Sequence, residues 1–245
     1  MTLKVPTYIE IIGEMYPTVQ VSAGGPLYSD LVWHAGDSLP SQVDLDAAIL
    51  TAVKLLQRKV VNDYRSVKLY GGYTHPHVYP ITDVTTGLNG TFVVDSDATI
   101  EFPAAAAFIV TGSTGNDGAW TVSSSSYDGG TTKTTLTVTG TIPDATVDGS
   151  TVVYIPWNSA PVDIQNLNAI ITLILAGAIT TDVEWHDFIN ISHMMTSTQL
   201  VTLAGGLGVF AQTCYAVSWV HKNAIDALTT VAAVDAYDYT TSWPA

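Results

Sequence analysis

The chain has 245 residues, of which 47% are hydrophobic, so it can bury a sizeable core and is not a disordered chain. Charged residues make up only 12%, and the net charge is −14. Nucleic acid is excluded as a general partner, because phosphate binding needs a basic footprint. A surface this poor in charge is typical of β-rich or densely assembled proteins. The first twenty residues show no signal peptide, and the most apolar stretch, residues 169–179, is too short to cross a bilayer. We therefore expect no membrane insertion.

Residues 1–75 are predicted to form a small module of short strands followed by a helix. Residues 19–21 and 31–33 have strand character, and a Gly-Gly-Pro turn lies between them. Asp44 is a plausible N-cap for the helix, which is expected to end near Tyr70 before a glycine pair. Its apolar face is predicted to consist of Ile49, Ala52, Val53, Leu56, Val60, Tyr64 and Val67.

The same helix carries most of the positive charge of the chain. Five of the eight basic residues lie in one fifteen-residue window: Lys54, Arg58, Lys59, Arg65 and Lys68. The simplest interpretation is a solvated helix face. The alternative is a docking face for an acidic neighbour, such as another copy of this acidic chain.

Residues 81–156 are predicted to form an inserted, small all-β domain. Lysine and arginine nearly vanish there, and Thr, Val, Gly, Ser and Asp dominate. Short apolar runs alternate with turn residues, which is typical of a β-sandwich or barrel. The expected strands are 91–94, 99–102, 107–110, 119–122, 134–138 and 152–155.

Residues 157–245 are predicted to form a C-terminal helical domain. Pro161 and Asp163 can open a first helix, and Gly177 can end it. Residues 187–191 are expected to form one strand. The closing aromatic tail is expected to be pinned against the domain rather than loose.

The longest predicted element is a helix over residues 196–228. Thr196 and Gln199 have the spacing of a capping box, and Met195 and Leu200 that of a hydrophobic staple. An a/d pattern continues over four heptads and predicts a seam that packs on another helix, within the chain or between chains. The seam residues, which we expect to form an assembly interface, are Leu200, Leu203, Leu207, Phe210, Cys214, Val217, His221, Ala224 and Leu228.

Three glycines fall inside this helix, at Gly205, Gly206 and Gly208. Each weakens a helix by up to about 1 kcal/mol relative to Ala. Either the helix breaks at this point, or another backbone approaches it closely. The second alternative suits a tightly packed protein.

The histidines are weak candidates for chemistry. His75 and His77 would share one face of an extended segment and could hold an ion together, but two ligands are not a site, and an exposed loop is the expected structure. His186 and His193 flank the expected strand, but no G-x-S-x-G nucleophile motif is present, and the lone Cys214 lies in an apolar stripe. His221 is expected to be a satisfied structural histidine. The sequence therefore predicts no enzyme, no metal site and no cofactor.

Three stretches carry a resemblance to bacteriophage structural proteins. The N-terminal residues resemble a small module of phage tail proteins through Tyr16-Pro17, Val19-Gln20-Val21, Tyr28-Ser29-Asp30-Leu31-Val32-Trp33, Leu39-Pro40-Ser41 and Leu45-Asp46-Ala47. Residues 108–122 are similar to a small β module of such proteins through Asn116-Asp117-Gly118-Ala119-Trp120-Thr121-Val122. Residues 196–245 resemble a C-terminal helical domain of unassigned function on phage tail and tail-fibre-associated proteins through Thr198-Gln199-Leu200, His221-Lys222-Asn223-Ala224-Ile225 and Ser242-Trp243-Pro244.

Together these observations predict an α+β protein, in which a helical module with a long C-terminal helix is split by an inserted β-sandwich or barrel. The resemblance implies a structural component of a tailed phage virion, made in the host cytoplasm. It would be a tail, fibre, baseplate or neck part that assembles with other virion proteins, and a heptad seam favours a homotrimer. The alternatives are a module that binds a host surface glycan or receptor through the β domain, and a tail-fibre assembly chaperone.

Overall fold

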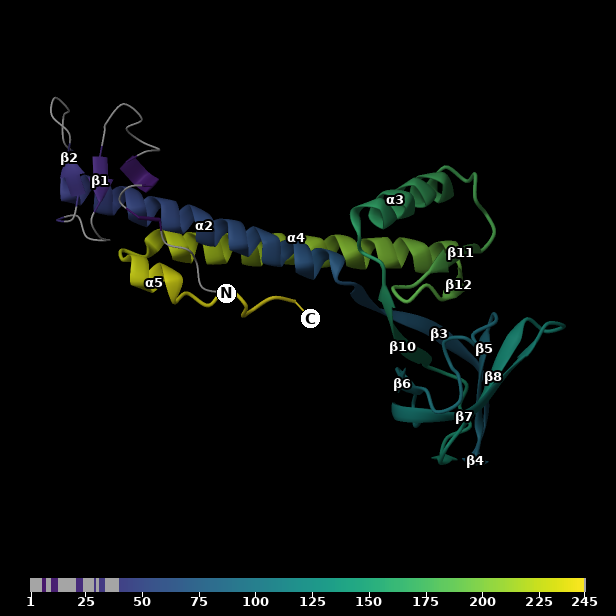
Figure 1. The fold of residues 1–245 in the computed structure, drawn as a ribbon. Coiled ribbons are helices and arrows are strands. Elements are labelled where there is room, and N and C mark those ends of the chain that lie inside the picture. Colours follow the sequence, from purple (N-terminus) through teal and green to yellow (C-terminus); the bar gives the residue numbers. More distant parts are fainter. Residues whose placement is uncertain are drawn as a thin grey trace. The chain divides into compact units, whose positions relative to one another are not determined.

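The fold is described from a computed structural model, for residues 6–7, 10–12, 21–23, 29, 31–33 and 40–244. It divides into two compact units, each described here by itself (Figure 1). Unit 1 comprises Met1–Lys68 with Ala211–Pro244, and unit 2 comprises Leu69–Phe210. Unit 2 is longer than the β domain predicted at 81–156. It contains the barrel and also residues 157–210, which were predicted to belong to the C-terminal helical domain.

Unit 1 begins with short elements. Residues 10–12 are helical, and β1 (Val21–Ala23) pairs with β2 (Leu31–Trp33) in an antiparallel ladder. The predicted strand at 19–21 overlaps the start of β1, but residues 19 and 20 and the Gly-Gly-Pro turn lie outside the described residues.

The first long helix, α2 (Gln42–Tyr70), is capped one turn earlier than predicted. The Ser41 hydroxyl accepts the backbone N–H of Asp44 at 3.1 Å and donates to the Asp44 carboxylate at 2.7 Å. Ser41 is thus the N-cap, and Asp44 closes the capping interaction from the first turn. The prediction of Asp44 as the N-cap was wrong by one helical turn.

The buried face of α2 differs from the predicted one beyond Val53. Leu56 and Val67 are exposed. Gln57 is buried in their place, and its side-chain amide donates to the Tyr237 carbonyl at 3.2 Å. Because Gln57 is polar, apolar spacing could not identify it as a core residue. The predicted buried face therefore included exposed residues in place of Gln57. The core of unit 1 contains Ile11, Ile12, Leu31, Leu45, Ile49, Val53, Val61, Ile225 and Val234.

The C-terminal tail is pinned, as predicted. After the short helix α5 (Val231–Asp235), the His221 ring is hydrogen-bonded to the Tyr237 hydroxyl at 2.8 Å and to the Thr241 carbonyl at 3.0 Å. The Trp243 ring stacks on the same imidazole, with 5.6 Å between ring centroids. His221 is therefore a satisfied structural histidine.

Unit 2 contains a closed barrel, which decides between the two predicted β architectures. Its strands follow the order β10-β3-β5-β8-β7-β6, and β6 pairs with β10 to close it. The barrel strands are β3 (Tyr73–Thr85), β5 (Thr91–Asp95), β6 (Ala107–Thr111), β7 (Gly118–Asp128), β8 (Lys133–Val138) and β10 (Ser150–Trp157). The short strands β4 (Gly87–Leu88) and β9 (Thr141–Ile142) form a separate pair.

The barrel interior is filled by alternate residues of these strands. Phe92, Phe102 and Phe108 are fully or nearly fully buried there, and their rings meet edge to face. The strand predicted at 99–102 is absent, because these residues form a turn between β5 and β6 that inserts Phe102 into the core. The other five predicted strands are present.

The helix α3 (Pro161–Leu175) follows the barrel. Pro161 stands at its first position, and Gly177, with φ +71°, ends it as predicted. A hairpin of β11 (Val183–His186) and β12 (Ser192–Met195) comes next. The strand predicted at 187–191 is wrong: these residues connect β11 to β12, and the Asp187 carboxylate accepts the N–H groups of Ile189 and Ile191.

The long helix α4 (Ser197–Ala227) is continuous through all three glycines. Its predicted capping box is present, since the Gln199 side chain accepts the Thr196 N–H at 2.8 Å and the Thr196 hydroxyl accepts the Gln199 N–H at 3.2 Å. One glycine is required by close packing: a Cβ at Gly206 would lie 2.6 Å from the Tyr73 hydroxyl and 2.9 Å from Nδ1 of His75. Of the two alternatives for the glycines, the helix break is thus absent. The close neighbour is present at Gly206, but it consists of side chains rather than another backbone.

Alanine substitutions at neighbouring glycines of α4 are expected to act in opposite directions. Gly205→Ala meets nothing within 4 Å and should raise the free energy of unfolding by up to about 1 kcal/mol, through helix propensity. Gly206→Ala should lower it by about 1 kcal/mol, because the new methyl displaces the hydrogen-bonded Tyr73 and His75 rings. Urea denaturation of both variants measures the difference. Equal stabilisation by the two substitutions would contradict the close contact.

Candidate functional site

Strand β3 carries His75 and His77 on its inward side. Alternate residues of a strand face the same side, and here His75, His77 and Tyr79 are all buried. Tyr79 belongs to the barrel core, and the His77 ring stacks on it with 4.8 Å between centroids. The expected exposed loop at these histidines is therefore wrong: the segment continues the barrel strand and is paired with β10.

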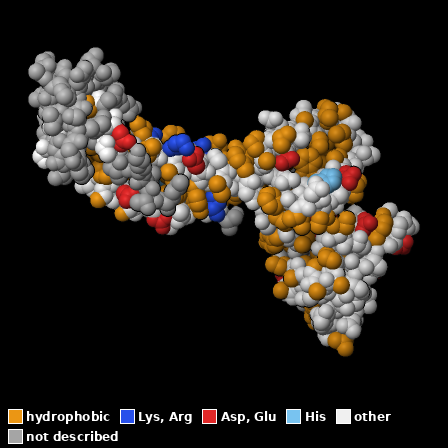
Figure 2. Space-filling view, in the orientation of Figure 1, with side chains coloured by type: hydrophobic (Ala, Val, Ile, Leu, Met, Phe, Trp, Pro, Cys, Tyr) orange, Lys and Arg blue, Asp and Glu red, His pale blue; other side chains and the backbone are white. Residues whose placement is uncertain are grey.

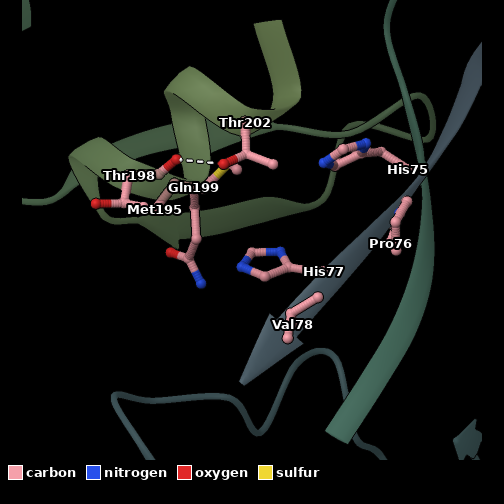
Figure 3. A pocket seen from close by; sticks show the side chains of 8 residues that line it. All are labelled: His75, Pro76, His77, Val78, Met195, Thr198, Gln199 and Thr202. Atoms are coloured by element: carbon pink, nitrogen blue, oxygen red, sulfur yellow. Dashed lines mark hydrogen bonds between the residues drawn. The ribbon is translucent and has the colours of Figure 1, made fainter. Parts of the chain in front are cut away.

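A pocket of about 140 Å³ lies between this strand and the start of α4 (Figure 3). Residues 75–78 form one wall, and Met195, Thr198, Gln199 and Thr202 form the other. None of these side chains is an acid, a lysine or an arginine. The capping box positions the second wall, because it fixes Gln199 at the first turn of α4.

His77 is the most unusual group in the pocket. Burial lowers the pKa of its imidazole to about 4, although Glu101 and Gln199 act in the opposite direction. Both of its ring nitrogens are buried and have no hydrogen-bond partner. At neutral pH the ring is thus uncharged, and its nearest polar neighbour in the pocket is the Gln199 side chain. Burial also lowers the pKa of His75, so the pocket as a whole is neutral.

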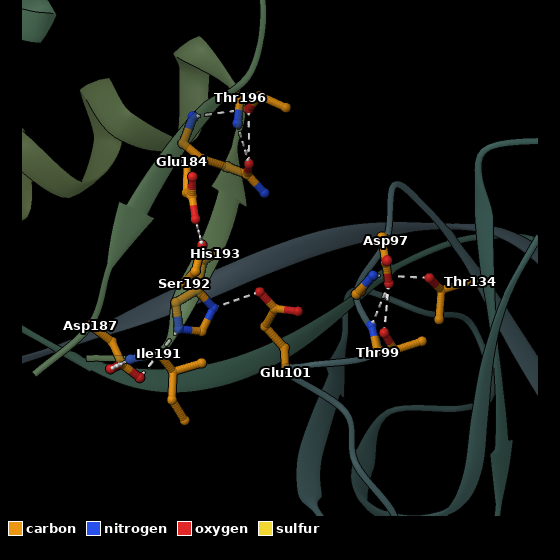
Figure 4. Close-up of polar contacts among 12 residues, drawn as sticks. Asp97, Thr99, Glu101, Thr134, Glu184, Asp187, Ile191, Ser192, His193 and Thr196 are labelled. Atoms are coloured by element: carbon orange, nitrogen blue, oxygen red, sulfur yellow. Dashed lines mark hydrogen bonds and ion pairs between the residues drawn. The ribbon is translucent and has the colours of Figure 1, made fainter. Parts of the chain in front are cut away.

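His193 lies between two carboxylates in the interior of unit 2 (Figure 4). Its Nδ1 is 2.7 Å from Glu101 and its Nε2 is 3.2 Å from Asp187. All three side chains are at most 5% exposed. Burial acts to lower the pKa of His193, but the hydrogen bonds to Glu101 and Asp187 outweigh it and raise the pKa above its usual value. We call these three residues the carboxylate–histidine cluster.

This cluster joins two parts of unit 2 rather than activating a nucleophile. Glu101 belongs to the turn after β5, whereas Asp187 and His193 belong to the β11–β12 hairpin. Both nitrogens of His193 are bonded to carboxylates, so neither is available to take a proton from a hydroxyl or thiol. Cys214 is buried, which raises the pKa of its thiol and makes it a poor nucleophile.

The remaining metal candidates are not brought together. His186 is exposed on β11 and pairs with Ser192 of β12. His193, the next residue of β12, pairs with Trp185 and is buried, so the two histidines do not share a face. Among the described residues, no group of three or more His, Cys, Asp or Glu side chains could hold a metal ion.

The predicted helix seam faces the inside of a single chain. Its first four residues, from Leu200 to Phe210, are buried in unit 2, where Leu200, Leu203 and Leu207 share one core cluster. Cys214 and His221 are buried in unit 1, and the other three seam residues are half-buried. In the single chain these side chains are thus occupied by intramolecular packing.

The basic face of α2 is partly paired within unit 1. The Lys54 ammonium donates to the Asp226 carbonyl at 2.7 Å, and Arg58 lies 3.2 Å from the Asp226 carboxylate. The Arg65 guanidinium covers the Tyr215 ring at 4.4 Å. For Lys54 and Arg58, the partner is therefore Asp226 on α4 of the same chain rather than a second molecule. Lys59 pairs with Asp63 at the surface, and Lys68 lies near enough to Cys214 to influence its pKa.

By length and composition alone, α4 is the one helix in the described part of the chain that could cross a membrane. Only 28% of its most apolar window is buried. The buried part is the seam side, which packs in the cores of the two units.

A family model described as "Domain of unknown function (DUF4376)" matches residues 136–241. The match begins in β8 and continues past α5, so it includes α3, the hairpin and α4. It thus covers the α4 wall of the pocket together with Asp187 and His193, but neither β3 nor Glu101. No curated protein and no solved structure matches the chain.

Sequence reasoning missed two members of the carboxylate–histidine cluster. The strand predictions at 99–102 and 187–191 include Glu101 and Asp187 and indicate no role for either carboxylate. Glu101 is the one glutamate in residues 81–156, and its place between Ile100 and Phe102, away from the Asp-Gly and Asn-Gly turn sequences, was the available signal. Gln199 was recognised only as a capping residue.

Proposed function

We propose that this chain is a structural component of a tailed bacteriophage virion, and that it acts by assembly with other copies and other virion proteins. The resemblance of its three stretches to phage tail modules supports the virion assignment. The observation that carries the assembly role is the amount of large apolar side chain left exposed in both units. Figure 2 shows hydrophobic side chains over much of the visible surface of unit 2, while the visible Lys and Arg lie over the helices of unit 1.

In unit 2, four of the exposed apolar side chains lie on the β11–β12 hairpin. Phe188, Ile189, Ile191 and Met194 are 45%, 66%, 40% and 49% exposed. They lie within seven residues of one another, and we call them the hairpin patch. Leaving such side chains in water forgoes about 25 cal/mol for each Å² that could be buried, so a contiguous apolar patch indicates a binding surface.

In unit 1, exposed apolar side chains lie on both long helices, and the aromatic ones are on α4. Tyr215, Trp219 and Val220 are 47%, 54% and 66% exposed; the four-residue spacing of Tyr215 and Trp219 places these two on one face, and Val220 follows Trp219 on the next. We call them the helix patch. Aromatic residues are enriched in protein interfaces and often contribute most of the binding energy. Closed symmetric oligomers are the norm, so we propose a closed homo-oligomer, and the homotrimer that the heptad seam favoured loses that support because the seam is buried within one chain.

The double variant Trp219→Glu with Val220→Glu is expected to convert an oligomer into a folded monomer, because it places two charges in a desolvated contact. Light scattering on a sizing column measures the mass of the wild type and the variant. Leu88→Glu changes a still more exposed apolar residue on β4 and should leave the mass unchanged. A wild-type protein that is a monomer at every concentration would contradict self-assembly.

A tail-fibre assembly chaperone is the alternative role for the same apolar surfaces. A chaperone leaves before the particle is complete, whereas a structural component stays in it. Mass spectrometry of purified virions separates the two, since the proposal requires this chain to be present in stoichiometric amount.

A further inference from the structure

Each aromatic ring of the helix patch has a cation on its face. The Arg65 guanidinium covers the Tyr215 ring at 4.4 Å, and the Lys222 ammonium lies over the Trp219 ring at 4.7 Å. Lys222 is only 6% exposed. Within the described residues, no carboxylate forms an ion pair with Arg65 or Lys222. These two charges are therefore part of any contact that the helix patch makes.

Positive charge gathers around the helix patch. In unit 1, α2 from Lys54 to Lys68 and α4 from Ala211 to Ala227 together hold six Lys and Arg against two Asp, a net charge of +4 in a chain whose net charge is −14. Burial lowers the pKa of Lys222, and the nearby Arg65 and Arg58 lower it further. The region is thus a basic island on an acidic protein.

The two cations restrict the chemistry of a partner. A purely apolar surface on the helix patch would take Arg65 and Lys222 further from water without an opposite charge, and an uncompensated buried charge is strongly unfavourable. A second helix patch fits worse, because it would bring like charges together across the contact. A partner that fits offers large apolar side chains with carboxylates beside them.

The hairpin patch is flanked by exposed carboxylates. The β11–β12 ladder pairs Glu184 directly with Met194, so both side chains lie on one face of the hairpin, and both are exposed. Asp182, just before β11, is exposed as well. Residues 182–195 contain three carboxylates and no Lys or Arg, and of the three only Asp187 is buried. The hairpin therefore combines apolar side chains with negative charge.

The charge of unit 2 as a whole has the sign that such a contact needs. Residues 69–210 hold twelve Asp and Glu and a single Lys, a net charge of −11. Charges attract over about 10 Å at moderate salt, so the basic island of one copy is drawn to unit 2 of another. Within that unit, the hairpin supplies the apolar surface that the exposed Trp219 requires.

We propose that the helix patch of one copy docks on the hairpin patch of a second copy, with Glu184 of the second copy facing Arg65 and Lys222 of the first. The inference rests on the proposed self-assembly and names the two surfaces that carry it. Such a contact is heterologous, because each copy contributes a different surface to each of its two neighbours. Repeated heterologous contacts form a ring where the rotation between copies closes.

Mixing two variants of the full chain tests which surfaces pair. Trp219→Glu with Val220→Glu disables the helix patch, and Ile189→Ser with Met194→Ser removes two exposed apolar residues from the hairpin patch. By light scattering on a sizing column, we expect an oligomer for the wild type and a monomer for each variant alone. An equimolar mixture should give a particle of two chains, because the first variant keeps its hairpin patch and the second keeps its helix patch.

A charge reversal tests the complementarity. Glu184→Lys should raise the dissociation constant of self-association at least about tenfold, because it places another cation beside Arg65 and Lys222. Asp83→Lys makes the same change at an exposed carboxylate on β3, outside the hairpin, and should not weaken association, since it lowers the overall negative charge. Should the serine variant fail to fold, Glu184→Lys takes its place in the mixture.

Three results would overturn this pairing and leave self-assembly intact. The first is a hairpin variant that keeps the mass of the wild type, which would mean that the helix patch pairs with another surface. The second is a mixture that stays monomeric, and the third is an equal effect of Glu184→Lys and Asp83→Lys. A wild type that is monomeric at every concentration is a different outcome, because it removes self-assembly itself and this contact with it.

Discussion

Glu101→Ala is expected to lower the free energy of unfolding by about 3–5 kcal/mol. The substitution leaves His193 and Asp187 as an incomplete ion pair inside unit 2, and breaking a buried charge network costs far more than removing a surface pair. Glu101 also holds its turn against the hairpin, so the loss should be global rather than local. Urea denaturation followed by tryptophan fluorescence measures it, because Trp157 packs edge to face on His193.

The matched control is Glu184→Ala, which removes an exposed carboxylate of the same hairpin that is bonded to Ser192. It should change the stability by no more than about 0.5 kcal/mol. Glu101→Gln should fall between the two, since it keeps a hydrogen-bonding oxygen but removes the charge. Equal effects of Glu101→Ala and Glu184→Ala would show that the cluster does not hold unit 2 together.

The same cluster gives the stability of the protein a defined dependence on pH. The pKa of His193 is raised in the folded state, so protonation of this ring favours folding. That contribution is complete below the unfolded pKa of about 6.5 and disappears as the pH rises through the folded pKa. His77 titrates in the opposite sense: its lowered pKa costs stability only as the pH falls from about 6.5 toward 4. His193→Gln should therefore remove the loss of stability on the alkaline side.

Local signals in the sequence were enough for the helices and most strands. The Thr196–Gln199 capping box and the spacing of Leu200, Leu203 and Leu207 located the start and buried side of α4. Gly177 ended α3 where its positive φ was needed. Each of these signals acts through residues fewer than about ten positions apart, which is the range over which propensity and capping operate.

The barrel and the carboxylate–histidine cluster depend on contacts that no local pattern contains. Closure requires β10 to pair with both β3 and β6, and His193 is 92 residues from Glu101 in the sequence. The alternation rule correctly placed His75 and His77 on one face of an extended segment. Whether that face was buried depended on α4 and the hairpin, which follow more than a hundred residues later. The sequence could therefore indicate a shared face but not a pocket.

Leu203→Ala is expected to lower the free energy of unfolding by about 2–5 kcal/mol at every protein concentration. Leu203 is fully buried in unit 2, in one cluster with Ile155, Trp157 and Met195, so the cavity forms inside a single chain. Val201→Ala changes an exposed residue on the same helix and should alter the stability by no more than about 0.5 kcal/mol. Thermal unfolding over about a hundredfold range of concentration tests both, since only a contact between chains makes the midpoint depend on concentration.

The outcome also decides which face of α4 can assemble. A loss of stability that is independent of concentration, together with an unchanged oligomer mass, means that the a/d seam is a core seam. Assembly must then use side chains outside the seam, such as Trp219 and Val220, which are exposed. A loss that disappears at high concentration would mean that the seam opens and pairs between chains, as in a coiled coil, and that the single-chain packing is only one of its two uses. A helix that is apolar on both sides can stabilise a chain with one face and join chains with the other, which explains why its heptad pattern alone could not distinguish the two roles.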